Sequence, residues 1–135
     1  MTTITVLGDE VATAAGEWVD GRPLVEPDGL SAAIGWTLKP EGLCRDDMCV
    51  PVRDRSAIEV GDKIDLAVAA DTLDRPTLLD PETSAVVLGQ PNATRQAALR
   101  DRQAPDFTFA DLDGADRSLS DYAGKKRLLV AFSSW

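Results

Sequence analysis

The amino-acid sequence predicts two structural units: an acidic α+β accessory domain over residues 1–95, followed by the incomplete start of an α/β domain over residues 104–135. Charge is one observation behind this division, because residues 1–95 carry 17 acidic and 8 basic side chains whereas residues 96–135 carry 6 of each. The other is a polar stretch with helical spacing, NATRQAALRDRQ, that leads to Ala104-Pro105. Proline restricts the backbone conformation of the residue before it, which prevents a helix from continuing. The boundary is therefore expected between Gly89 and Ala104, with residues 96–103 as a linker.

Short strands and a helix are predicted in the first part of the accessory domain. Residues Thr3–Leu7 are rich in β-branched side chains, which favour a strand. Asp20-Gly21 lies between two short apolar stretches in EWVDGRPLV, a pattern typical of a β-hairpin. A short helix is expected from Asp28 to Ile34, where Gly35 ends it.

The rest of the accessory domain is predicted to mix a hairpin, a helix and two further strands. The stretch WTLKPEGLCRDDMCVPV indicates a loop and a tight hairpin that carries both cysteines. Asp62 is the expected N-cap of a helix whose apolar face holds Ile64, Ala67 and Val68, because these positions follow the i, i+3, i+4 spacing. In RPTLLDPETSAVVLG, the segment that begins at Asp80 is the expected turn between two strands.

Composition excludes several classes of function. The chain has a net charge of −9 and no histidine, so no imidazole can act as a base or metal ligand, and its acidity disfavours nucleic acid and anionic lipid as partners. No apolar run approaches the roughly 18 residues of a membrane span. The N-terminal stretch MTTITVLGDE has no basic leader, so we expect a cytoplasmic protein without membrane contact. No glycine-rich phosphate-binding pattern is present, and no cofactor is expected.

The two cysteines, Cys44 and Cys49, lie in CRDDMC with four residues between them. On opposite sides of a tight turn, their Cβ atoms can approach the ~3.5–4.5 Å that a disulfide requires. Three interpretations remain open. A reducing cytoplasm favours two ordinary thiols, and the next interpretation is a reversible disulfide that exchanges with a redox partner. A zinc site is the least favoured, because structural zinc uses four Cys or His ligands and only Asp46 and Asp47 lie nearby.

Residues 104–135 carry four spaced motifs in a fixed order: APDF from Ala104, DLDG from Asp111, SLSDY followed by GK from Ser118, and an apolar strand that ends at Trp135. Together they resemble the opening of the redoxin branch of the thioredoxin superfamily, which includes alkyl hydroperoxide reductase/thiol-specific antioxidant proteins and TlpA/ResA-like proteins. The resemblance covers about the last quarter of the chain. It implies an incomplete thioredoxin-like α/β domain made of the N-terminal hairpin and the central strand.

The residues of this segment predict the same elements without the resemblance. Phe107 to Phe109 alternates as a strand, and Asp113-Gly114 supplies a tight turn. Residues 118–122 return along the first strand and form a short turn that Gly124 closes. Leu128 to Phe132 is apolar on both faces, as an interior strand covered by helices would be.

The resemblance implies the activity of a thiol–disulfide oxidoreductase or a thiol peroxidase, with a thiol reductant or a protein disulfide as partner. Redoxins work through a thiolate at the N-terminus of the helix after this strand, where the helix dipole favours the anion. The chain stops before that position, so no catalytic residue is carried over, and the 135 residues are expected to be inactive in the family's reactions. A competing hypothesis is a non-enzymatic partner-binding module that carries a redoxin remnant.

An end at Trp135 also predicts something about the gene. The next position is where the family places its reactive cysteine, and some redoxins use selenocysteine there, encoded by a UGA codon that is read as a stop. A frameshift, a nonsense mutation or deliberate shortening are the alternatives. For residues 1–95 no family resemblance is found in the sequence.

Overall fold

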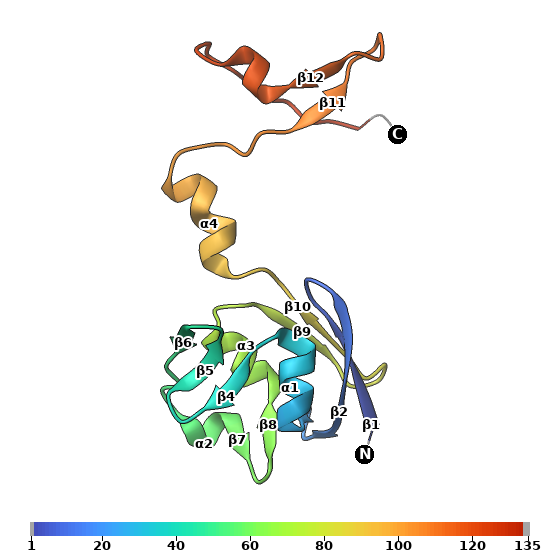
Figure 1. Cartoon of the computed structure of the whole chain (residues 1–135). Coiled ribbons are helices and arrows are strands. Elements are labelled where there is room, and N and C mark those ends of the chain that lie inside the picture. The colour runs from blue at the N-terminus through green and yellow to red at the C-terminus, as the bar shows by residue number, and fades with distance from the viewer. Residues whose placement is uncertain (1, 134–135) are drawn as a thin grey trace. The chain divides into compact units, whose positions relative to one another are not determined.

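The computed structural model describes residues 2–133, which divide into two compact units after Gln96 (Figure 1). The division lies inside α4 (Asn92–Arg100), a helix without a buried residue. Residues 96–100 of the predicted linker are therefore helical. Among residues 2–133, no helix is long and apolar enough to cross a membrane.

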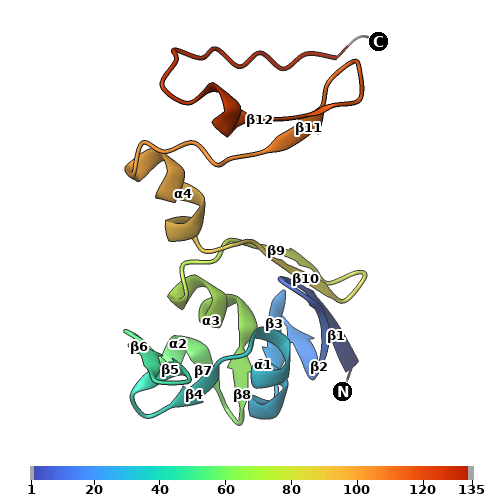
Figure 2. The same ribbon diagram turned by 45° about the horizontal axis from the view of Figure 1, so that its top comes forward.

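A seven-stranded sheet forms the body of the first unit. Its strands run in the order β7-β8-β3-β2-β1-β10-β9, and all neighbours are antiparallel except β1 and β10, which are parallel. The sheet is curled, with β9 and β10 towards one end (Figure 2). The strands are β1 (Thr2–Leu7), β2 (Val11–Val19), β3 (Arg22–Val25), β7 (Glu59–Val60), β8 (Lys63–Asp65), β9 (Thr77–Asp80) and β10 (Ala85–Leu88).

Alternation and turn chemistry explain why these segments form strands. In β1, Ile4 and Val6 are buried while the threonines between and beside them are not, which is the period of two expected of a sheet with one face in the core. Asp20 and Gly21 both have positive φ, 50° and 76°, as the two-residue turn of a tight hairpin requires. The predicted strand, the Asp20-Gly21 hairpin and the Asp80 turn between β9 and β10 are confirmed.

Three short helices complete the core. They are α1 (Pro27–Ile34), α2 (Arg55–Ile58) and α3 (Leu66–Thr72), and α1 packs against β2 while α3 packs against β3 (Figure 1). Gly35 ends α1 with a φ of 71°, a left-handed conformation that glycine adopts without steric cost. The predicted helix and its end are confirmed. Leu30, Ile58 and Leu66 contribute fully buried side chains to a single core cluster.

A second, three-stranded sheet is built from β4 (Thr37–Lys39), β5 (Gly42–Arg45) and β6 (Met48–Val50). β5 is the central strand and pairs antiparallel with both neighbours. Trp36 and Leu43 from this region belong to the buried core, so the small sheet is attached to the first unit by apolar contact. The predicted tight hairpin is confirmed, and β4 adds a strand that the sequence left as a loop.

The N-cap of α3 is Asp65. The prediction of Asp62 as the N-cap is therefore wrong. The Asp65 carboxylate accepts hydrogen bonds from the backbone N–H groups of Ala67 (2.9 Å) and Val68 (3.1 Å), and its other oxygen accepts one from Arg22 Nε at 2.6 Å. Ile64 consequently lies in β8. The helical spacing beginning at Ile64 was misleading because a strand and a helix meet there and both bury their apolar residues.

The second unit contains a short hairpin and one helical turn. β11 (Thr108–Ala110) pairs antiparallel with β12 (Asp116–Ser118), and the 3-10 helix η1 (Leu119–Tyr122) follows. Gly114, at a φ of 82°, lies in the connecting turn. The Ser118 hydroxyl accepts from the backbone N–H of Asp121 while the Asp121 carboxylate accepts from that of Ser118, which fixes the start of η1. The predicted strand, turn and return are confirmed.

The strand predicted over Leu128–Phe132 is not formed within the described residues. This segment has no backbone ladder, and Leu128 and Phe132 are 90% and 89% exposed. A strand is defined by pairing with a neighbour, and within residues 97–133 the one ladder that the structure contains joins β11 to β12. The predicted end of the strand at Trp135 lies outside the described residues. The thioredoxin-like fold class stays a prediction.

The capping carboxylate of α3 supports a testable expectation. Asp65 is 1% exposed, so Asp65→Ala leaves two backbone N–H groups and a guanidinium without their acceptor, and we expect the free energy of unfolding of the full chain to fall by about 2–3 kcal/mol. Asp62→Ala is the matched control: the side chain is 86% exposed and its effect should stay within about 0.5 kcal/mol. Equal effects of the two substitutions in urea unfolding would contradict this assignment.

Candidate functional site

Cys44 and Cys49 lie directly opposite each other on β5 and β6 and are joined by a disulfide. Asp46 and Asp47 form the turn between the two strands, and Asp46 adopts a φ of 53°, a left-handed conformation that aspartate tolerates better than most residues. The four intervening residues are thus two turn residues and one residue on each strand. That count is what brings the two cysteines into register.

Gly42 sets how closely the two strands approach. A Cβ atom at this position would lie 2.1 Å from the carbonyl oxygen of Val50, and the φ of Gly42 is 134°, where side chains other than hydrogen are strained. Glycine at the start of β5 therefore permits the close pairing that continues to the cysteines.

The disulfide occupies a non-hydrogen-bonded position of the β5–β6 pair. The Cα atoms of Cys44 and Cys49 are 4.1 Å apart, close to the ~4.5 Å of such pairs and far from the ~5.5 Å of hydrogen-bonded pairs. At a non-hydrogen-bonded position, the N–H and C=O groups of each residue point away from the partner strand. Those of Cys44 point to β4, whereas those of Cys49 point to the open side of β6, which has no other neighbour in the described sheet.

The two sulfur-bearing residues differ in their access to solvent. Cys44 is 3% exposed, and its Sγ lies 3.7 Å from the carbonyl oxygen of Gly42. Cys49, on the edge strand, is exposed. When the bond is reduced, the Cys44 thiol can donate a hydrogen bond to Gly42 in place of the lost sulfur contact. In this pair, Cys44 is therefore buried and Cys49 is accessible to solvent.

Side chains on the opposite face of the same hairpin contact the core. Leu43 is fully buried, and the guanidinium carbon of Arg45 lies 4.7 Å from the ring centroid of Trp36, a cation–π contact. Arg45 and Met48 also line an open cavity of about 550 Å³. Because side chains alternate along a strand, this cavity and the disulfide lie on different faces of the small sheet.

Arg55 holds the other end of the small sheet in place. Its Nη1 donates to the backbone carbonyl of Lys39 at 2.8 Å, and its Nη2 donates to Glu59 Oε1 at 2.6 Å. This hydrogen bond raises the pKa of Arg55 and lowers the pKa of Glu59. The turn between β4 and β5 is thereby tied to α2, independently of the disulfide.

Of the three interpretations of the cysteines, the disulfide is the one that the structure contains, and its reversibility stays a prediction. Within residues 2–133 no group of three or more Cys, His, Asp or Glu side chains is arranged to hold a metal ion. Asp46 and Asp47, which a zinc site would need, are turn residues and make no ion pair in the described part of the chain.

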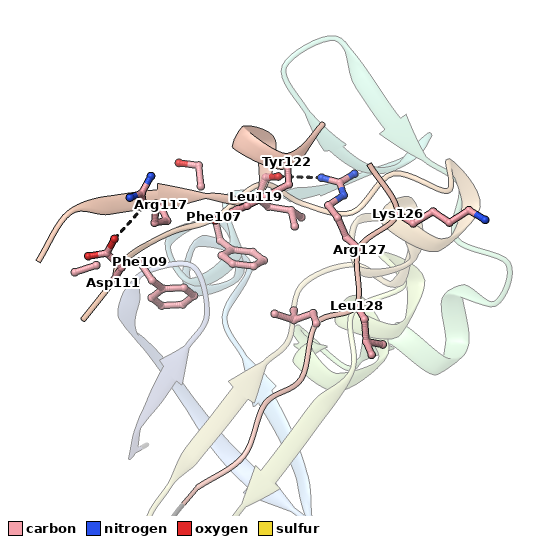
Figure 3. A pocket seen from close by; sticks show the side chains of 12 residues that line it. Phe107, Phe109, Asp111, Arg117, Leu119, Tyr122, Lys126, Arg127 and Leu128 are labelled. Atoms are coloured by element: carbon pink, nitrogen blue, oxygen red, sulfur yellow. Dashed lines mark hydrogen bonds and ion pairs between the residues drawn. The ribbon is translucent and has the colours of Figure 1, made fainter. Parts of the chain in front are cut away.

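A second concave site lies within the second unit (Figure 3). Phe107 and Phe109 point to the same side of the hairpin with ring centroids 5.3 Å apart, and Leu128 lies across from them. The cavity between them measures about 420 Å³. Its wall is mostly apolar, and it contains no cysteine. Such a space can receive an apolar group, and it supplies no nucleophile for thiol chemistry.

Two polar contacts shape the rim of this cavity (Figure 3). Arg117 Nε donates to Asp111 Oδ2 at 2.9 Å, and Arg127 Nη1 donates to the backbone carbonyl of Leu119 at 2.9 Å. The pKa of Asp111 lies below its usual value, chiefly because its carboxylate accepts from the backbone N–H of Ala115, and secondarily because of Arg117. The sequence placed Asp111 in a family motif, and its structural role is to close the turn of the hairpin.

Reduction of the disulfide should weaken the first unit without unfolding it. The bond joins residues separated by only five positions, so its removal restores about 2 kcal/mol of chain entropy to the unfolded state. Leu43, Trp36 and Arg55 still hold the small sheet. We expect urea unfolding of the full chain to shift by about this amount when a phosphine reductant is added, with a cooperative transition retained. Loss of the transition would mean that the bond is essential for folding.

Acid should loosen the β11–β12 hairpin. The pKa of Asp111 in the folded chain lies below the usual 3.8, so its contribution to stability is present above that value and is lost as the pH falls through the lower, folded pKa. We expect the protection of the hairpin amides, taken relative to the intrinsic exchange rate at each pH, to fall below about pH 3.8, and Asp111→Asn to reduce that dependence. Asp113→Asn, at an exposed position of the same turn, is the control and should leave it in place. An Asp111→Asn chain with an unchanged acid response would contradict this.

Comparisons with known proteins leave these sites to be judged from their own geometry. The chain has no significant match among protein-family models, among curated protein sequences or among solved structures.

Proposed function

We propose that this chain takes part in thiol–disulfide exchange as part of a redoxin-type oxidoreductase, and that Cys44 and Cys49 are its reversible disulfide. The observation that carries the proposal is the disulfide itself, which joins a buried residue, Cys44, to an exposed residue on the edge strand, Cys49. A disulfide inside a core would only stabilise the fold, because no other thiol could reach it. A bond at the edge of a small sheet can be reached by another thiol.

Residues 104–133 support the redoxin part of the proposal. Their hairpin, with its turn at Gly114, is one of the two elements that the resemblance implies, and the other, the central strand, is not formed within the described residues. No catalytic residue of the redoxin family is assigned to this chain. The exchange chemistry of residues 2–133 is therefore assigned to Cys44 and Cys49 alone, and peroxide reduction by the chain is not expected.

Exchange at this pair is chemically simple. A thiolate of the reductant attacks one sulfur of the bond, the other sulfur leaves as a thiolate, and a second thiol completes the reduction by releasing the first as a new disulfide. In the cytoplasm, the compartment that the sequence predicts, such a bond cycles only if its reduction potential is near that of the thiol pool. The small sheet keeps its core contacts in either state, because Leu43 and Trp36 lie on the face opposite to the sulfurs.

A partner-binding module without redox activity is the second candidate. The observation in its favour is the apolar side chains that the second unit exposes, Phe109, Leu128 and Phe132, of which Phe109 and Leu128 line the cavity of Figure 3. Apolar surface of this kind marks contact sites in many proteins. In that case the disulfide would only stabilise the hairpin.

The two candidates differ in how the disulfide responds to a thiol buffer. We expect the full chain, equilibrated with mixtures of reduced and oxidised glutathione and then alkylated, to show by mass spectrometry a reversible transition with a potential above about −300 mV. The chain should consume no hydrogen peroxide. The variant C44S/C49S is the control and should show no transition.

A pair that stays closed at potentials well below about −300 mV would be a structural staple, and the redox proposal would fail. The binding-module candidate would then remain, since its surface is formed by residues that the substitutions leave untouched.

A further inference from the structure

We propose that Cys49 is the sulfur that an incoming thiol attacks, and that this thiol is delivered by an extended, basic segment of a partner protein that pairs with the open edge of β6. The inference rests on the proposed function, because it assumes that the Cys44–Cys49 bond opens. Beyond that function, it assigns Cys49 Sγ as the attacked atom, Cys44 Sγ as the leaving atom, and a basic extended segment as the partner.

Burial decides which sulfur is attacked. Cys44 lies in the central strand between β4 and β6 and is 3% exposed, whereas Cys49 lies in an edge strand and is exposed. An attacking sulfur must approach on the side opposite to the leaving sulfur. For attack on Cys49 that side is the open edge of β6. For attack on Cys44 it is occupied by β4, where Thr37 pairs with Cys44.

The backbone of Cys49 offers the means to position a partner strand. Its N–H and C=O groups point to the open edge, because Cys44 and Cys49 form a non-hydrogen-bonded pair with Cα atoms 4.1 Å apart. An extended segment that adds antiparallel to this edge can exchange both hydrogen bonds with Cys49. The residue opposite Cys49 then forms a hydrogen-bonded pair with it.

The geometry of that pair allows a mixed disulfide after a small approach of the two strands. Cα atoms of a hydrogen-bonded antiparallel pair are ~5.5 Å apart, within the range of disulfides, and their Cβ atoms, ~5.5 Å apart, must move about 1 Å closer to reach the ~3.5–4.5 Å that a disulfide requires. Directly opposed residues on three neighbouring strands lie along one line, and their side chains share a face of the sheet. A cysteine on the added strand therefore has its sulfur beyond Cys49, in line with the bond to Cys44.

Charge indicates the composition of the partner segment. Asp46 and Asp47 at the tip of the hairpin are exposed and have no ion-pair partner among residues 2–133. Arg45, the basic residue beside them, lies on the other face against Trp36. The first 95 residues are also strongly acidic. Lys or Arg next to the incoming cysteine would be attracted to this edge and would speed association.

The step balances without another reactant. The thiolate of the partner forms a bond to Cys49 Sγ, the bond between Cys49 and Cys44 breaks, and its electron pair goes to Cys44 Sγ. The Cys44 thiolate takes a proton from water. The resulting thiol can donate a hydrogen bond to the carbonyl oxygen of Gly42, which lies 3.7 Å from the sulfur in the oxidised form. A second thiol of the partner, attacking the mixed disulfide, returns the partner as its own disulfide and leaves Cys49 reduced.

Four short peptides with one cysteine each would test this on the oxidised full chain. The first is extended and basic, with Lys and Thr around the cysteine. The second is identical but N-methylated at the cysteine, which removes the N–H that would pair with the Cys49 carbonyl. The third carries Glu in place of Lys, and the fourth has Pro on both sides of the cysteine. Dithiothreitol serves as the small thiol without a backbone.

We expect the first peptide to form a mixed disulfide at least tenfold faster than the other three, measured by acid quench and mass spectrometry. Peptide mapping should place it on Cys49. In separate labelling with a maleimide, the free thiol of the C44S variant should react faster than that of C49S.

Each result bears on one claim. If excess dithiothreitol does not open the bond, the proposed function itself fails. If dithiothreitol opens it but the mixed disulfide maps to Cys44, or the four peptides react at equal rates, the function stands and the present inference is overturned.

Discussion

The close approach of β5 to β6 at Gly42 is the constraint on which the candidate site depends. A Cβ atom at this position would lie 2.1 Å from the carbonyl oxygen of Val50, so only glycine fits at this separation of the two strands. A larger residue would push the two strands apart or shift their register. Either change would move Cys44 away from Cys49, so the residue at position 42 determines whether the disulfide can form.

The core contacts of the small sheet lie on one of its faces, and the disulfide lies on the other. Leu43 and Trp36 on the inner face belong to the core, and Arg55 ties the β4–β5 turn to α2. Cys44 and Cys49 lie on the other face, outside the core cluster to which Leu43 and Trp36 belong. Opening the bond therefore changes the constraint on the hairpin and leaves its attachment intact. A redox-active pair needs this separation, because both states must stay folded.

Local signals in the sequence predicted most of the elements, and the failures have a common cause. Asp20-Gly21, Gly35 and the Asp80 turn act within a few residues, so their outcome could be read from the chain alone. The α3 cap was misplaced because Asp65 is selected by its contact with Arg22, 43 residues away in sequence. The strand over Leu128–Phe132 depended on pairing partners that residues 97–133 do not offer.

The candidate site was predictable to the same degree. The spacing of Cys44 and Cys49 indicated that they could meet across a turn. Which of the two cysteines is buried could not be predicted from the sequence. Burial of Cys44 depends on the pairing of β4 with β5, and the sequence predicts a loop where β4 lies.

The short separation of the two cysteines has a consequence for biosynthesis. Residues 42–50 form the whole hairpin, so the disulfide can close soon after this segment leaves the ribosome, before β7, β8, β9 and β10 have emerged. Among these 135 residues the two sulfurs have no competing partner. Within these residues closure can therefore give only one pairing, and an isomerase has no wrong pairing to correct.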